Sequence, residues 1–298
     1  MTLQEVFDNF ITSRKLADLS QSTITDYVNF LKPFLRTFGG EYDFFELTNE
    51  AIDAYIQSLL NRDISKATRS TYIRNLRIFL HWAEREYPVK YDARKIKIPK
   101  TPKKAVRIYS DEDIKIIFDS IHNDIRWVEK RNRCIVALMY DSGLRQSEVC
   151  TLQKRHLYLS MNRMTVCGKG SKERTVPLGK TAKQYLLEYL AECPYDTEYV
   201  FMGHNGKPLT CNAVKLFISK LAKLLPFELS SHKLRHNFAT NYCLDQYRTQ
   251  NNVDIFRLMH LMGHEDIETT KRYLHFANEI IASESCVSHL DNMLLQST

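Results

Sequence analysis

A proline-bearing basic stretch, residues 89–107, is the feature that most constrains how this chain can fold. A long helical pattern stops where it begins, and Pro99 and Pro102 lie within it. Proline lacks a backbone N–H and its ring clashes with the preceding turn, so no helix runs through these positions. A chain of 298 residues also suits about two domains. We therefore expect residues 1–88 and 108–298 to fold as separate domains, joined by an extended linker.

The charge of this linker is almost entirely positive. Its basic side chains are Lys90, Arg94, Lys95, Lys97, Lys100, Lys103, Lys104 and Arg107, and only Asp92 opposes them. The whole chain carries a net charge of +7. Such a run is either a solvated linker or a strap along a phosphate backbone, and charge alone favours neither interpretation. The candidate DNA contacts are Lys95, Lys97, Lys100, Lys103 and Lys104.

Hydrophobic periodicity predicts the fold class. In the first domain apolar residues such as Leu3, Val6 and Phe10 recur at helical spacing, and four such segments predict a small all-α domain. The second domain begins with helical patterns and continues with short strand-like runs, two of which flank a glycine-bearing tip at residues 167–174. Residues 199–202 suggest one more short strand. We expect a mainly α-helical protein with a small antiparallel β-sheet.

Composition excludes several classes of protein. No run approaches the roughly 20 apolar residues that span a bilayer, and the start M-T-L-Q-E-V-F lacks the features of a secretory signal. The seven cysteines are scattered and form no C-x-x-C. That spacing argues against a disulfide framework and against a cysteine-rich zinc site. We expect a cytoplasmic protein with no membrane association.

Two glycine-bearing segments of the second domain carry charges that need an explanation. In S-G-L-R-Q-S-E-V, Arg145 begins a helix against the dipole preference, so either the Glu148 carboxylate or an incoming phosphate must favour it. In C-G-K-G-S-K-E-R, Lys169 is most simply an exposed turn lysine, but a flexible tip can also swing its ammonium into a cleft as a proton donor. Lys172 and Arg174 beside it are further candidate DNA contacts.

Histidines and a tyrosine follow in three later segments. In S-H-K-L-R-H-N-F-A-T, His232 and Arg235 share a helix face, and His232 and His236 have the i, i+4 spacing of a zinc pair. The glutamate of H-E-x-x-H is missing, so we expect no metal site. L-M-G-H ends at His264 and K-R-Y ends at Tyr273, for which a helix cap and a core aromatic are the ordinary interpretations.

Together these residue types suit metal-free attack on a phosphodiester. Arginines bind and neutralise the non-bridging oxygens, and a lysine can protonate a leaving alkoxide. A histidine can accept a phenolic proton, which makes tyrosine a covalent nucleophile. No acidic cluster suits a catalytic Mg²⁺, so we expect no cofactor.

In the order and form of these motifs the chain resembles the tyrosine recombinase (phage integrase) family. The matching segments are G-L-R-Q-S-E at Arg145, G-K-G-S-K-E-R at Lys169, H-K-L-R-H at His232 and Arg235, L-M-G-H at His264, and K-R-Y at Tyr273. The resemblance implies a SAM-like core-binding domain and a catalytic domain that form a C-shaped clamp on DNA. We expect no arm-binding domain before them, which favours an Xer-like recombinase, a transposon resolvase or a small integrase.

The resemblance also implies a reaction, in which Tyr273 attacks the scissile phosphate and leaves a 3′-phosphotyrosine and a free 5′-hydroxyl. The other implied roles are phosphate binding by Arg145, Arg235 and His264, general acid catalysis by Lys169, general base catalysis or orientation by His232, and support by Glu148 and His236. Neither ATP nor metal takes part. Four protomers would act on two double-stranded DNA sites and exchange C-terminal tails, with monomers or weak dimers in the free state.

Two other functions stay open. A type IB topoisomerase-like enzyme uses similar residues to nick and close one duplex as a monomer, and a non-catalytic architectural protein would bind DNA without cutting it. The apolar tail argues against the first, and the complete set of catalytic residue types argues against the second. The separation of His232 from His264 is several residues longer than in compact family members. We expect residues 243–252 to lengthen a helix or a loop there.

Overall fold

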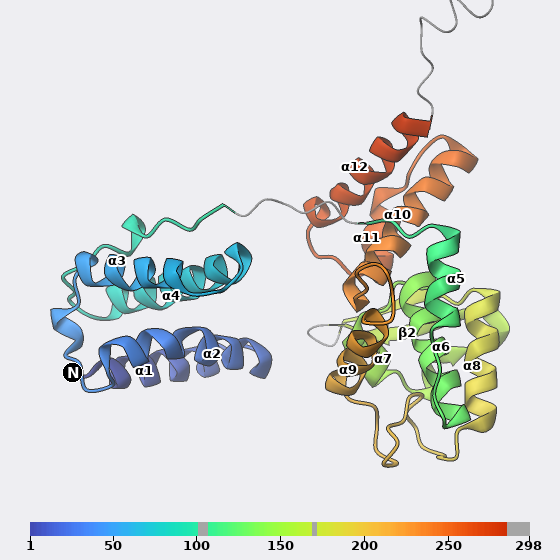
Figure 1. Cartoon of the computed structure of the whole chain (residues 1–298), viewed down its shortest axis with the longest axis horizontal. Coiled ribbons are helices and arrows are strands. Elements are labelled where there is room, and N and C mark those ends of the chain that lie inside the picture. The colour runs from blue at the N-terminus through green and yellow to red at the C-terminus, as the bar shows by residue number, and fades with distance from the viewer. Residues whose placement is uncertain (101–106, 169–171, 285–298) are drawn as a thin grey trace, which may run out of the picture. The chain divides into compact units, whose positions relative to one another are not determined.

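The structure is a computed structural model that describes residues 1–100, 107–168 and 172–284. It separates into two compact units, Met1–Lys104 and Ala105–Thr298. Helices make up most of both units, and the described strands all lie in the second (Figure 1). The expected fold class, mainly α-helical with a small antiparallel sheet, is confirmed. Within the described ranges, no helix has the length and apolar character needed to cross a membrane.

The first unit is a helical domain with an aromatic core. Its helices are α1 (Leu3–Leu16), α2 (Gln21–Phe38), α3 (Asn49–Ser58) and α4 (Lys66–Glu86). Each begins at a hydroxyl side chain that accepts a hydrogen bond from the backbone N–H three residues later, namely Thr2, Ser20, Thr48 and Ser65. The apolar faces meet around the rings of Phe10, Phe34 and Phe79, which are buried and pack edge to face.

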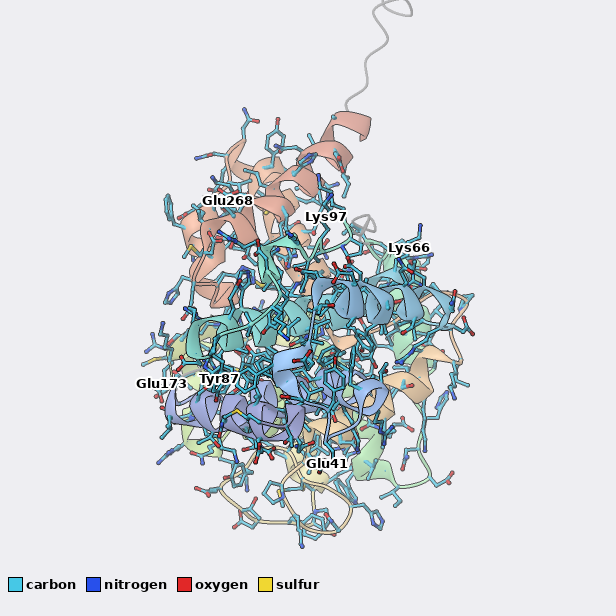
Figure 2. All side chains as sticks on the ribbon, turned by 90° about the vertical axis from the view of Figure 1, so that its left-hand side faces the viewer. Glu41, Lys66, Tyr87, Lys97, Glu173 and Glu268 are labelled. Carbon is cyan, nitrogen blue, oxygen red and sulfur yellow. The ribbon has the colours of Figure 1, made fainter. Side chains whose placement is uncertain are left out.

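The segment after α4 departs from the expectation of an extended linker. Tyr91, Ala93 and Ile96 are buried in the core of the first unit, and the Tyr91 hydroxyl donates to the Leu80 carbonyl at 3.2 Å. Apolar side chains on this stretch therefore anchor it to the helical domain. The lysines of this stretch, Lys95, Lys97 and Lys100, stay exposed, and Lys97 is labelled in Figure 2.

The second unit surrounds a short sheet with helices. Its helices are α5 (Asp111–Asp119), α6 (Arg126–Asp141), α7 (Gln146–Thr151), α8 (Lys180–Glu192), α9 (Cys211–Ala222), α10 (Ser231–Gln250), α11 (Ile255–Met262) and α12 (Ile267–Glu284). The strands β1 (Leu157–Tyr158), β2 (Arg163–Cys167) and β3 (Glu173–Pro177) pair antiparallel in that order. Cys167 pairs with Glu173 at the hairpin end.

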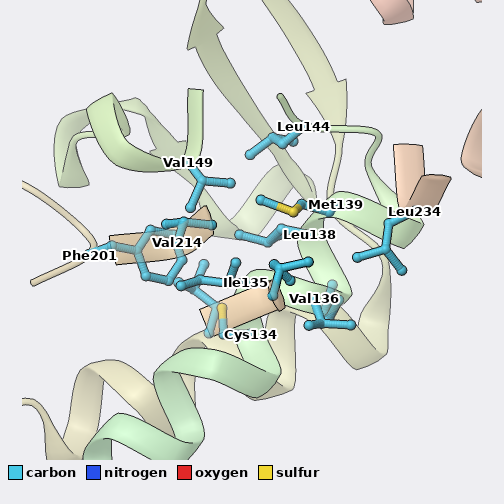
Figure 3. Packing of buried hydrophobic residues seen from close by; sticks show 14 of the residues in the cluster. Cys134, Ile135, Val136, Leu138, Met139, Leu144, Val149, Phe201, Val214 and Leu234 are labelled. Carbon is cyan, nitrogen blue, oxygen red and sulfur yellow. The ribbon is translucent and has the colours of Figure 1, made fainter. Parts of the chain in front are cut away.

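Helix α6 forms the centre of the second core. Its Ile135 and Leu138 are buried, and Leu144, Val149 and Leu234 from neighbouring elements pack in the same cluster (Figure 3). Val149 belongs to α7 and Leu234 to α10. Close packing of these apolar side chains fixes both helices against α6 and so fixes where their polar side chains lie.

Two short segments, residues 199–202 and 243–252, were open in the sequence and are defined by the structure. Residues 199–202 form no strand, because only isolated bridges join Tyr199 to Gln153 and Met202 to Pro208. The extra chain at 243–252 lengthens α10, which continues to Gln250 and ends at Asn251 in the left-handed conformation. The addition therefore extends α10 away from its first turns, where His232 and Arg235 lie.

Candidate active site

Arg145 begins α7 and is held there by Glu148. Gly143, two residues earlier, has a φ of +64°, and a Cβ at that position would overlap the Phe238 ring, so the turn requires glycine. Arg145 Nη1 donates to Glu148 Oε1 at 2.8 Å, and its backbone N–H donates to Glu148 Oε2 at 2.7 Å. The carboxylate explains why an arginine is stable at the N-terminus of a helix.

Glu148 is a buried carboxylate surrounded by guanidinium groups. It is 1% exposed, and both of its oxygens also accept hydrogen bonds from Arg174 on β3. Arg235 Nη1 lies 3.9 Å from Glu148 Oε2. Burial would raise the pKa of the Glu148 carboxyl, but the hydrogen bonds and charge of Arg174, together with the hydrogen bonds of Arg145, leave that pKa below its usual value. One negative charge among three positive ones leaves the site with an excess of positive charge.

The same three arginines bind consecutive carbonyls at the end of α11. Arg174 Nε donates to Leu261 O at 2.7 Å, Arg235 Nη2 donates to Met262 O, and Arg145 Nη2 donates to Gly263 O at 2.7 Å. These carbonyls form the negative end of the helix dipole, which favours cations. The geometry ties α7, β3 and α10 to the last turn of α11.

Arg235 is the most deeply embedded of these groups. Its guanidinium also donates to the Gly143 carbonyl, and the residue is buried. Burial, and then repulsion from Arg145, lowers the pKa of Arg235 to about 9, which still leaves it protonated at neutral pH.

Tyr273 lies on α12 with its hydroxyl inside the site. The residue is 1% exposed, and its Oη lies 2.6 Å from His236 Nδ1 and accepts from Arg272 Nη2 at 3.2 Å. Burial, followed by the charges of Arg272 and other neighbours, lowers the pKa of His236 to about 4. A neutral His236 can accept at Nδ1, so the phenolic proton has an acceptor in place.

His264 follows α11 and faces the same tyrosine. Its ring is stacked on Tyr273 with centroids 6.1 Å apart, and its Nδ1 lies 2.8 Å from Thr270 Oγ1. Burial, and then the charges of Arg235 and Arg145, lowers the pKa of His264 to about 4. A neutral imidazole held in this way can donate a single hydrogen bond to an anion.

His232 and Lys169 are the remaining expected residues. His232 is exposed on α10, one turn before His236. Lys169 lies outside the described residues. The residue before it, Gly168, is close to the site, since a Cβ there would lie 3.7 Å from Glu148 Oε1.

A cleft of about 860 Å³ opens beside these groups. Arg145, Gly168, Gly263 and His264 are among the residues that line it. Among the residues that the structure describes, no group of three or more histidine, cysteine or acidic side chains could hold a metal ion. The lining includes the cations Arg145, Lys172 and Arg174 and also the carboxylates Glu173, Glu265 and Asp266. An anion would therefore be favoured at the end where Arg145 and His264 lie.

The expected DNA contacts divide into three groups. Lys95, Lys97 and Lys100 are exposed on the first unit, while Lys103 and Lys104 lie outside the described residues. Lys172 is exposed and pairs with Glu265 at 2.6 Å. Arg174 departs from the expectation, because it is 6% exposed and its guanidinium is occupied by Glu148 and a carbonyl.

Comparisons with known proteins agree with this architecture. A model of the phage integrase family matches residues 108–279, and a model of the phage integrase N-terminal SAM-like domain matches residues 6–88. "Tyrosine recombinase XerC" of Rickettsia bellii is 35% identical over 185 residues, which cover 60% of this chain and 58% of that protein. The XerC of Pediococcus pentosaceus is 26% identical over 293 residues, covering 94% and 95%.

A solved structure shares the fold. The Tn1549 transposon integrase in complex with transposon right end DNA has a TM-score of 0.74 at 14% identity, with 96% of this chain and 100% of that chain covered. The match with the Rickettsia protein spans about 58% of that relative's length. The family model, however, covers more than half of the present chain, from the start of the second unit into α12. This chain therefore belongs to the phage integrase family.

Proposed function

We propose that this protein is a site-specific DNA recombinase that cuts and rejoins strands through a 3′-phosphotyrosine intermediate. The observation that carries the proposal is a buried tyrosine hydroxyl 2.6 Å from a neutral histidine nitrogen, beside a cluster of arginines. Arg145 and His264 line the adjoining cleft, and Tyr273 stacks on His264, so a phosphodiester bound there would meet positive charge next to the nucleophile and its proton acceptor.

In the first step Tyr273 Oη attacks the phosphorus and its proton passes to His236. A P–O bond to tyrosine forms as the bond to the 5′-oxygen breaks, and Lys169 donates the proton that this oxygen needs. Arg145, Arg235 and His264 hold the non-bridging oxygens as charge develops on them. His232, exposed one turn from His236, is assigned to the phosphate rather than to the phenolic proton.

In the second step a 5′-hydroxyl from another strand attacks the phosphotyrosine. The energy of the cleaved bond is kept in the intermediate, so the reaction needs neither ATP nor metal. We propose that double-stranded DNA is bound by the exposed lysines of residues 95–100 and by Lys172, and that four protomers act on two sites in the cytoplasm. The domains that go with this are a helical domain at 1–88, a basic connecting segment at 89–107 that is anchored to the helical domain at Tyr91 and Ile96, and a catalytic domain at 108–298.

The test uses duplexes selected from a random library for binding to the full chain. A selected duplex with a nick beside the cleavage point should trap a covalent adduct, because the freed strand diffuses away before religation. Tyr273→Phe should bind the duplex and trap nothing, whereas the matched change Tyr158→Phe at an exposed tyrosine should trap normally. An adduct that persists in Tyr273→Phe would refute the nucleophile.

Two further measurements separate the alternatives. Adduct formation should continue in EDTA, and a strict metal requirement would contradict the mechanism. Relaxation of supercoiled plasmid without the selected site, by a monomer, would instead indicate a type IB topoisomerase-like enzyme.

A further inference from the structure

Arg174 turns its side chain from β3 into the second unit, where each nitrogen of its guanidinium has an internal acceptor. Nε donates to the Leu261 carbonyl at 2.7 Å, and the two terminal nitrogens donate to the two carboxylate oxygens of Glu148. Such a bidentate pair needs the planar fork of arginine, which an ammonium cannot reproduce. With these nitrogens occupied, little of Arg174 is free for a DNA phosphate.

Arg145 is held by the same carboxylate as Arg174 and by a neighbouring carbonyl of the same helix end. Glu148 accepts hydrogen bonds from the side chain and the backbone N–H of Arg145, at 2.8 and 2.7 Å. Gly263, two residues after Leu261, accepts the other terminal nitrogen of Arg145 at 2.7 Å. Because these carbonyls belong to one helix end, a shift of Leu261 also moves Gly263 and the histidine that follows it.

We propose that Arg174 is a positioning residue for strand cleavage: it holds Glu148 and the last turn of α11 in the arrangement that aims Arg145 and His264 at the scissile phosphate. That the bound group is a scissile phosphate rests on the function proposed above. The contacts among Arg174, Glu148 and Arg145 do not depend on that function.

The electrostatics of the site point the same way. The charged and titratable groups around Glu148 are Arg145 from α7, Arg174 from β3 and Arg235 from α10, with His264 after α11 and Tyr273 of α12 next to Arg235. Burial favours the neutral form of Glu148, and Arg174 is the foremost of the partners that favour the charged form. Without Arg174, we expect the pKa of the Glu148 carboxyl to rise, so that the carboxyl takes up a proton as the pH falls.

The experiment compares Arg174→Leu and Arg174→Lys with the control Arg163→Leu. Arg163 is an exposed arginine on the adjacent strand and has no part in the site. The rate of adduct formation is measured on the nicked duplex at saturating protein. We expect Arg174→Leu to slow it by about 100-fold, as for a misplaced catalytic group, with Arg174→Lys between it and the wild type. Arg163→Leu should cleave at the wild-type rate.

DNA affinity across a salt series separates positioning from direct phosphate binding. A positioning role leaves the affinity and its salt dependence unchanged in Arg174→Leu. If Arg174 instead bound a phosphate directly, the substitution would reduce the salt slope by about one.

The pH profile gives a signature that a merely structural role would not produce. In Arg174→Leu, cleavage should fall as the pH is lowered from about 8 to about 5, because a protonated Glu148 no longer orients Arg145. The thermal stability of Arg174→Leu relative to the wild type should instead rise as the pH is lowered. A carboxyl whose folded-state pKa is raised contributes stability at low pH and loses it as the pH rises. Adding Glu148→Gln should abolish both trends.

The outcomes are distinguishable. If the wild type forms no adduct, the proposed function fails, while the stability arm needs no DNA and still tests the positioning role. If the wild type forms the adduct and Arg174→Leu forms it equally fast, or if the salt slope falls by about one, the inference is overturned. If Arg174→Leu does not fold, Arg174→Lys carries the same measurements. A pH trend that survives Glu148→Gln would also overturn it.

Discussion

Gly263→Ala tests whether the end of α11 controls the arginines. Gly263 has a φ of +57°, and a Cβ placed there would lie 3.1 Å from Arg145 Nη1 and 3.1 Å from Arg174 Nη1. The left-handed conformation costs an L-residue about 1–2 kcal/mol. The close approach requires the two guanidinium groups to give way, and Arg145 is the group that also donates to the Gly263 carbonyl.

The expected losses of stability and of cleavage rate follow from the backbone cost and from the displacement of Arg145, respectively. For a unit of this size, 1 kcal/mol corresponds to about 2–4 °C in melting temperature, so the backbone term lowers it by about 2–8 °C. A displacement of Arg145 from the phosphate on the order of 1 Å slows cleavage by roughly 100-fold. We expect DNA affinity to change little, because most of it comes from interactions elsewhere on the DNA backbone.

The assay measures single-turnover adduct formation together with thermal unfolding, and Gly206→Ala is the matched control. Gly206 has a φ of +71°, and its Cβ would lie 3.1 Å from the Tyr195 ring, away from the arginines. Both variants should melt lower, and only Gly263→Ala should lose cleavage. Equal cleavage by the two variants would show that the carbonyls of α11 do not position the arginines.

Three other predictions follow from the same structure. Replacing Lys95, Lys97 and Lys100 by glutamine should lower the salt slope of DNA binding by about 0.9 for each phosphate that is no longer neutralised. The slope is measured from binding isotherms at several salt concentrations. An unchanged slope would show that these lysines do not contact DNA. The pKa of His236 is lowered to about 4, so its contribution to stability is present above its unfolded value near 6.5 and is lost as the pH falls towards 4; unfolding between those values should show this loss, and His236→Asn should reduce it. Leu138→Ala removes a buried side chain under α7 and should cost about 2–5 kcal/mol in chemical denaturation, and a cost below about 1 kcal/mol would contradict the packing described.

The helices could be predicted because their signals are local. Apolar residues that recur within a few positions indicate a helix, and Leu3, Val6 and Phe10, which were expected on one, all lie buried on α1. Arg145 could likewise be singled out, since an arginine at a helix start has few stable partners, and Glu148 three residues later was one of the two expected. The expectation of an extended linker was wrong for its first part, because Tyr91 and Ile96 anchor that part to the helical domain and their spacing follows neither a helical nor a strand period.

The environment of Arg174 could be predicted only in part from the sequence. The alternation of buried and exposed residues in β3 places Arg174 on the same face as the buried Val176, so the inward direction could have been inferred from the strand period. The partner of Arg174 could not be inferred in this way, because Glu148 is 26 residues away on α7. The same holds for His236, whose hydrogen bond with Tyr273 joins residues 37 apart.

The sequence by itself determined the residue types of the site and the elements that carry them, because helix and strand periods and turn glycines act over a few residues. The tertiary structure decided which of those residues touch: three arginines on one buried carboxylate, their donation to the carbonyls of α11, and His236 rather than His232 at the tyrosine hydroxyl. These interactions depend on how α6 packs against its neighbours, and side-chain packing in a close-packed core is specified by the whole unit rather than by any one segment.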